Sequence, residues 1–166
     1  MHMPALPKFE IQVYRSGAPL PAEAEELFAP SLRDSRQLLS EDRWDRHSWS
    51  FALILAVAPG AHVLGGVHLD LGPIGGAGPL AKARLGYLER TFVRPEYRRQ
   101  GLASQLLGQT LCIARQADCL YLRCSNNWDN EAERRLFLKF GFALVDLDGE
   151  RDEEPCYLAV RPLQNL

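Results

Sequence analysis

The chain has 166 residues, 46% of them apolar, which is enough for one domain with a hydrophobic core and short for two. Its 19 basic and 21 acidic residues give a formal net charge of −2, which argues against a protein that mainly coats nucleic acid or anionic lipid. We therefore expect a single domain over residues 1–166, with no nucleic-acid or membrane partner. Any anion site must be local.

The four cysteines show neither CxxC spacing nor a companion histidine pattern. The sequence therefore predicts no metal site and no disulfide framework. The first ten residues, MHMPALPKFE, lack the charged-then-apolar pattern of a secretory signal, and no apolar run approaches the ~20 residues that a membrane span needs. We expect a cytoplasmic protein.

The first half of the chain predicts three strands, with a helix and a stretch of weak periodicity between the first strand and the second. Alternation over 9–14 predicts a strand, and a short helix is expected at 22–28. The polar stretch 29–47 has weak periodicity, so we interpret it as helix fragments and loops that form part of a binding rim. Two apolar runs, 49–58 and 63–71, predict a hairpin that feeds a buried sheet.

The second half alternates strands and helices. A strand that stops before Pro95 is followed by helical periodicity, another apolar run, a second amphipathic stretch that Gly141 closes, and two last runs. We expect strands at 85–93, 119–124, 142–145 and 156–160, and helices at 102–115 and 130–140. This order indicates a mixed α/β sheet with helices on its faces.

An anion site is expected where the helix begins near Gly101, because the first amides of a helix have no internal partner and carry partial positive charge. Arg94, Arg98 and Arg99 add charge around it. The helix end gives only about 0.3–1 kcal/mol, whereas a micromolar ligand needs about 8. Several charged hydrogen bonds of ~1.5–3 kcal/mol each bring the sum into range. A diphosphate with a long tail fits this site.

Two motifs resemble those of the GNAT acetyltransferase superfamily. The run Val93, Pro95, Arg98-x-x-Gly101-x-Ala103 is similar to its pyrophosphate signature, Q/R-x-x-G-x-G/A. A second motif, commonly written N-E-x-A-x-x-L-Y-x-K-x-G-F, is matched by Asn130-Glu131, Leu136-Phe137, Lys139 and Gly141-Phe142. The resemblance implies a mixed, mostly antiparallel sheet of about six to seven strands, with helices on both faces and splayed fourth and fifth strands.

The resemblance also implies acetyl-CoA, or another acyl-CoA, as co-substrate. Its pantetheine arm would pair with the backbone near Phe92 and Val93, and Asn130 would touch it. The backbone amides around Gln100 to Ala103 would hold the diphosphate. The expected CoA-binding residues are Phe92, Val93, Arg98, Arg99, Gln100, Gly101, Leu102, Ala103, Ser104, Asn130 and Phe137.

Acyl transfer to an alkylamine requires a base, because such an amine is almost wholly protonated at neutral pH. Glu89 is the candidate, since family members often carry a catalytic glutamate on this strand. Alternation would put Tyr87, Glu89 and Thr91 on one face, and partial burial should raise the pKa of Glu89 toward neutrality. The alternative is a carboxylate paired with an arginine such as Arg90 or Arg123 for structural reasons.

One position departs from the family pattern. Many members use a tyrosine of the second motif to protonate the departing thiolate, but here that residue is Phe137. Either the thiolate leaves without direct protonation, or Tyr121, Tyr157 or a water serves as the acid.

We expect transfer of an acetyl group to an amine by direct attack in a ternary complex. The acceptor would be a small molecule or a protein, and homodimers are frequent in the family. A sensor that binds acyl-CoA without turnover is the alternative, and an interaction domain without cofactor is a more distant one.

Overall fold

The computed structural model of the chain describes residues 4–40, 49–75, 78–147 and 156–164. Seven strands form one sheet in the order β1-β2-β3-β4-β5-β7-β6. Within the described residues, β4 and β5 are the one parallel pair, and all other neighbours are antiparallel. The strands are β1 (Glu10–Arg15), β2 (Ser50–Ala58), β3 (His62–Pro73), β4 (Arg84–Val93), β5 (Cys119–Asn127), β6 (Ala143–Leu147) and β7 (Cys156–Pro162). The expected mixed, mostly antiparallel sheet is confirmed.

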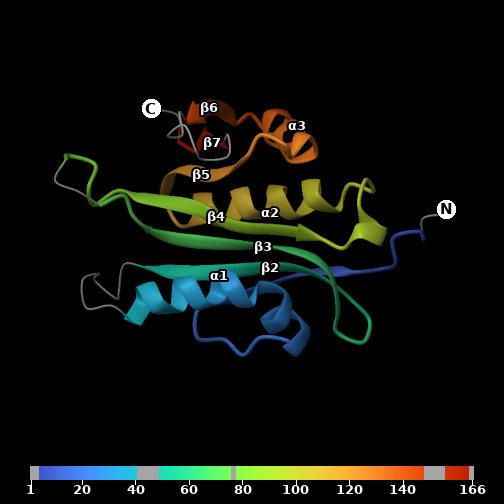
Figure 1. Cartoon of the computed structure of the whole chain (residues 1–166). Coiled ribbons are helices and arrows are strands. Elements are labelled where there is room, and N and C mark those ends of the chain that lie inside the picture. Colours follow the sequence, from blue (N-terminus) through green and yellow to red (C-terminus); the bar gives the residue numbers. More distant parts are fainter. Residues whose placement is uncertain (1–3, 41–48, 76–77, 148–155, 165–166) are drawn as a thin grey trace.

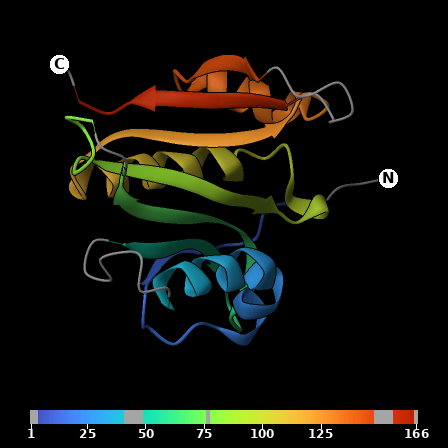
Figure 2. The ribbon, with the colours of Figure 1, turned by 60° about the vertical axis from the view of Figure 1, so that its left-hand side comes forward.

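Helices cover both faces of this sheet (Figures 1 and 2). Helix α1 (Ala22–Ser40) packs on one face with Phe28 and Leu32 against Leu53 and Leu55 of β2. Helix α2 (Leu102–Gln116) packs on the other face, where the larger core lies. The short helix α3 (Glu131–Lys139) lies beside β6 and adds Phe137 to that core. A 3-10 turn, η1 (Pro95–Tyr97), joins β4 to the loop before α2.

The expectation for 29–47 was wrong where the structure describes it, because α1 runs on through Pro30 to Ser40. The buried stripe of the helix continues with Ser31 and Ser35, so the hydrophobic period fades although the helix does not end. Both serines face buried polar groups of β3 rather than solvent. Residues 41–47 of the expected binding rim lie outside the described residues.

Among the described residues, no helix is both long and apolar enough to cross a membrane.

We predict that Phe28→Ala lowers the free energy of unfolding by about 3–5 kcal/mol, because it removes a fully buried ring from the α1 side of the sheet. Urea denaturation of the two proteins measures this difference. The matched control is Glu26→Ala, an exposed position of the same helix, which should change stability by no more than about 0.5 kcal/mol. Equal losses in both variants would show that α1 is held by something other than this contact.

Candidate functional site

The parallel strands β4 and β5 separate part-way along their length. Their pairing runs from Arg84 with Cys119 to Tyr87 with Arg123, and beyond that point no pairing joins the described residues of the two strands. Strand β4 nevertheless continues to Val93 and β5 to Asn127. The predicted splay is thus present. It leaves strand edges facing each other without the hydrogen bonds that a sheet would give them.

Two cavities occupy this opening and meet each other. The smaller, of about 270 Å³, lies at the fork, and the larger, of about 550 Å³, lies toward the start of α2. Thr91, Asn130 and Glu133 line both. The site is therefore one continuous channel from the fork of the strands to the N-terminus of α2.

The larger cavity gathers nine of the eleven expected CoA-binding residues. These are Phe92, Val93, Arg98, Arg99, Gly101, Leu102, Ala103, Ser104 and Asn130. Gln100 is not among them, because its side-chain amide donates to the carbonyls of Pro4, at 3.0 Å, and Glu96. Phe137 lines the smaller cavity instead. Tyr97 and Leu136 also line the larger cavity, and the sequence analysis missed both.

The backbone before α2 is shaped as an anion cradle requires. Gly101, the N-cap, has φ of 83°, a left-handed conformation that favours glycine, and a Cβ placed there would point into open space. In the described part of the chain, no side-chain hydrogen bond caps this end of α2, so the amides of its first turn lack a capping side chain. Arg99 is also left-handed, with φ of 61°. Two such residues in one short loop are a backbone cost that a binding function can explain.

The expected role of Arg94 in surrounding the anion is not what the structure shows. Its Nε donates to the carbonyl of Val63 at 2.7 Å, and its guanidinium pairs with Glu23 of α1. It therefore ties the segment just after β4 to β3 and α1, and it does not line the larger cavity. Arg98 and Arg99 remain as the cations at that cavity, and Arg98 Nε also donates to the Val93 carbonyl at 3.0 Å.

Glu89 lines the smaller cavity at a β-bulge. His68 pairs with Arg90 and Leu69 with Leu88, so Glu89 is the extra residue on β4. The bulge breaks the expected alternation. Thr91 pairs with Val67 of the α2-side core, whereas Glu89 reaches Asp70, on the α1 side of the sheet. The prediction that Thr91 shares a face with Glu89 was therefore wrong.

The surroundings of Glu89 favour its protonated form. Burial, the charge of Asp70, a hydrogen bond with Asp70 and the charge of Asp34 together raise its pKa to about 7, against the opposing charge of Arg123. No ion pair to an arginine is present among the described contacts of Glu89, since Arg90 lies over the Phe92 ring and Arg123 over the Tyr87 ring. The structural alternative of a Glu89–arginine pair is thus not supported.

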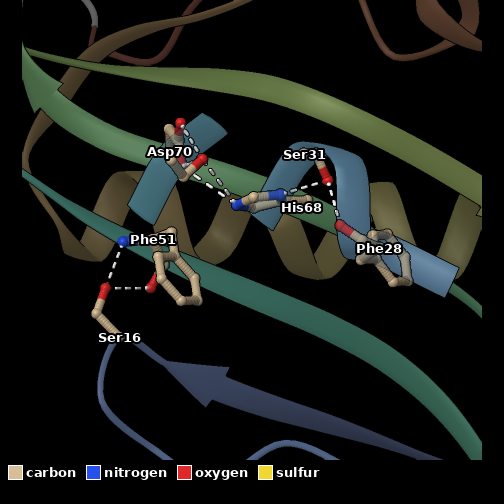
Figure 3. A network of polar contacts seen from close by, with 7 residues as sticks. Ser16, Phe28, Ser31, Phe51, His68 and Asp70 are labelled. Carbon is tan, nitrogen blue, oxygen red and sulfur yellow. Dashed lines mark hydrogen bonds and ion pairs between the residues drawn. The ribbon is translucent and has the colours of Figure 1, made fainter. Parts of the chain in front are cut away.

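Asp70 is held in place by a buried network between β3 and α1 (Figure 3). Ser35 donates to both carboxyl oxygens, at 2.9 and 2.8 Å, and His68 Nε2 lies 3.2 Å from Oδ1. The other ring nitrogen of His68 is 2.8 Å from Ser31 Oγ, which donates to the carbonyl of Phe28. This network fixes the carboxyl group of Asp70 beside that of Glu89, where its charge and hydrogen bond add to burial in raising the pKa of Glu89.

The two tyrosines proposed as acids do not line either cavity. Tyr121 lies in the paired part of the β4–β5 ladder, opposite Leu85. Tyr157 is fully buried on β7 against the Trp128 ring, and burial raises its pKa further above the ordinary value. Neither expected acid is therefore a lining residue of the channel.

Glu133 is an ionisable residue of the site that was not among the residues predicted from the sequence. It lines both cavities, and burial raises its pKa to about 7. The signal available in the sequence was its position, because the second motif has alanine there.

The sequence matches the family model described as "Acetyltransferase (GNAT) family" over residues 21–142. The chain belongs to the GNAT family of acetyltransferases. Its match begins at the start of α1 and ends just after α3, so it contains every element that lines the channel. A search among curated proteins found no match.

Solved GNAT structures share the fold. A proposed acyl-CoA N-acyltransferase from Klebsiella pneumoniae is 21% identical, with a TM-score of 0.61 over 93% of this chain and 98% of that one. Arabidopsis thaliana NAA60 in complex with acetyl-CoA is 15% identical, with a TM-score of 0.59 over 91% and 99%. An Elizabethkingia anophelis GNAT acetyltransferase with acetyl-CoA bound is 17% identical, with a TM-score of 0.58 over 92% and 98%. At these identities the likeness establishes the fold.

We predict that Asp70→Asn lowers the pKa of Glu89 below 7 in this GNAT protein, because it removes the nearest negative charge and so favours the ionised form of Glu89. Carbon-13 NMR titration of the glutamate carboxyl groups measures this, with Glu89→Gln assigning the resonance. The exposed Asp118→Asn is the control and should leave the titration in place. An unchanged midpoint in Asp70→Asn would mean that burial alone sets the pKa.

Proposed function

We propose that this protein transfers an acetyl group from acetyl-CoA to an amine by direct attack within a ternary complex. The observation that carries the proposal is the position of Glu89. Its carboxyl group, with a pKa of about 7, lines a cavity continuous with the free N-terminus of α2. The proposal thus joins a site for the diphosphate and a base for the amine in one channel.

The residues of the larger cavity fit a CoA thioester. The free amides of Leu102, Ala103 and Ser104, with Arg98 and Arg99 beside them, suit the diphosphate. Toward the fork, the open edge of β4 at Val93 offers backbone groups to the amides of the pantetheine arm, in the manner of an added strand. The thioester would then lie in the smaller cavity, next to Glu89.

Glu89 would act as the general base. An alkylammonium must lose a proton before its nitrogen attacks the thioester carbonyl, and Glu89 accepts that proton directly or through one water. A carboxyl with a pKa of about 7 is half ionised at neutral pH and still basic enough to be useful. Asp70 contributes by keeping this pKa raised.

A sensor that binds acyl-CoA without turnover is the second candidate, and Phe137 is the observation that favours it. This residue lines the smaller cavity without the hydroxyl that many family members use as acid. The single domain over 1–166, the cytoplasmic location and the homodimer also stand as predictions from the sequence. The acceptor class we propose is an amine, of a small molecule or of a protein.

We predict that acetyl-CoA at 100 times its Kd stabilises the protein by about 2.7 kcal/mol, which raises Tm by roughly 5–10 °C. Replacing both Arg98 and Arg99 with glutamine should weaken binding about 100-fold or more, because two charged hydrogen bonds are lost. Thermal shift and calorimetry measure both effects. Arg33→Gln, an exposed arginine of α1, is the control and should bind like the parent protein. A protein that acetyl-CoA does not stabilise would be neither transferase nor sensor.

We predict that Glu89→Gln lowers kcat by about 10²- to 10⁴-fold in a thiol-release assay with a panel of amines. Since the base works only when ionised, the rate of the parent enzyme should rise as the pH increases toward about 7, and the variant should lose that acid limb. Acetyl-CoA binding should be retained in the variant. If the profile and the rate of the variant match those of the parent enzyme, Glu89 is not the base.

A further inference from the structure

Two residues of the second motif depart from the family pattern together. Where the pattern has tyrosine the chain has Phe137, and where it has alanine the chain has Glu133. The two positions are one helical turn apart on α3, and both side chains line the smaller cavity with Glu89. The chain has therefore lost a hydroxyl group and gained a carboxyl group on the same face of the same helix.

The contacts of Glu133 turn its carboxyl group toward β5. Asn126 of β5 donates its side-chain amide to Glu133 Oε2, and Asn130 Nδ2 donates to the same oxygen at 2.9 Å. The backbone amide of Glu133 donates to Asn130 Oδ1 at 3.2 Å, while its side chain accepts from the two side-chain amides. No described hydrogen bond reaches Oε1, which leaves one carboxyl oxygen for the channel.

Burial without a cation keeps a proton on this carboxyl group near neutrality. The pKa of Glu133 is raised to about 7 by burial, and no described ion pair compensates its charge. The adjacent Arg134 lies over the Trp128 ring, 5.3 Å from its centre. Such a group is half protonated at pH 7, as a general acid should be.

We propose that Glu133 donates the proton to the departing CoA sulfur and takes the place of the missing tyrosine. The proposal rests on the proposed function. Glu89 first takes the ammonium proton and passes it to water. As the amine nitrogen then bonds to the acetyl carbon, Glu89 accepts a second proton from that nitrogen. As the bond from carbon to sulfur breaks, its electron pair stays on sulfur and Glu133 gives the sulfur a proton. The products are the amide and the free thiol, and proton exchange with water restores both carboxyl groups.

The other groups around Glu133 are poorer donors. Cys124 on β5 faces it with a pKa raised to about 12 by burial, and Tyr157 on β7 has its pKa raised as well, so both hold their protons too tightly. Across the cavity, β4 contributes Glu89 and Arg90. Of these groups on α3, β5 and β7, Glu133 is thus the one that exchanges its proton near neutral pH, and the proposed base Glu89 lines the same cavity with a similar pKa.

The proposal predicts a bell-shaped pH dependence of kcat, because activity needs Glu89 ionised and Glu133 protonated. With both pKa values at about 7, roughly a quarter of the enzyme has this combination at pH 7 if the groups titrate independently. Glu133→Gln should lower kcat about 10²- to 10⁴-fold and abolish the alkaline limb while keeping the acid limb. A merely structural role would lower the rate without changing the shape of the profile.

The matched control is Glu131→Gln. This carboxyl group lies on the same helix, 63% exposed and paired with Arg135, and it should leave the profile unchanged. A second variant tests the role directly: adding Phe137→Tyr to Glu133→Gln should recover at least about tenfold in kcat, with the alkaline limb returning above about pH 9 because a phenol has a pKa near 10. Adding Phe137→Tyr to Glu89→Gln should recover nothing. Failure of the rescue together with a retained alkaline limb in Glu133→Gln would overturn the proposal.

Free CoA supplies a readout that does not depend on turnover. Ultraviolet absorbance of the thiolate gives the pKa of the bound CoA thiol, which a nearby carboxylate raises. In Glu133→Gln this pKa should fall by about half a unit or more, with Glu131→Gln unchanged. Equal thiol pKa values would place Glu133 away from the sulfur and overturn the inference, even if the parent enzyme turns over. Bound CoA with the expected thiol shift but no turnover with any amine would instead reject the proposed transfer.

Discussion

The separation of β4 from β5 after the Tyr87–Arg123 pair is the constraint on which the site depends. Backbone N–H and C=O groups need partners, and two strand edges that face each other across an opening lack the ladder that would supply them. A ligand with its own amides can satisfy these edges, as an added strand would. The same opening brings three elements to one channel: β4 with Glu89, the start of α2, and α3 with Glu133.

The pKa of Glu89 in the channel depends on buried residues of the core. Burial and the neighbouring Asp70 raise the pKa of Glu89, and Asp70 is held by Ser35 and His68 at the buried contact between β3 and α1. Two buried carboxyl groups are costly unless they share protons or accept hydrogen bonds, and this network supplies the bonds. The packing of α1 and the proposed base Glu89 are thus linked. Ser31 and Ser35 interrupt the hydrophobic stripe of α1, and the same serines hold His68 and Asp70 in place next to Glu89.

Two carboxyl groups line the smaller cavity, and they supply the base and the acid of the proposed chemistry. Glu89 comes from a bulge in β4 and Glu133 from the first turn of α3, and both have a pKa of about 7. The causes differ, because neighbouring negative charge adds to burial at Glu89, whereas burial is the cause at Glu133. A base and an acid of similar pKa suit a reaction in which one proton leaves nitrogen and another reaches sulfur. Phe137, which lines the same cavity, supplies only apolar contact.

The sequence by itself determined most of the elements and the loop before α2, because periodicity, Pro95 and the conformational demand at Gly101 are local properties of the chain. The two motifs also predicted the family, and Glu89 was identified with a pKa near neutrality. Only the tertiary structure decided which side chains meet. The register of β3 against β4 places the bulge at Glu89 and moves Thr91 to the other face, and Arg94 turns to Glu23. The length of α1 also depends on partners distant in sequence, because Ser31 and Ser35 contact His68 and Asp70 of β3. The proposed role of Glu133 likewise depends on its contact with Asn126 of β5. A hydrogen bond between such residues leaves no periodic pattern along the chain, so only the folded arrangement reveals it.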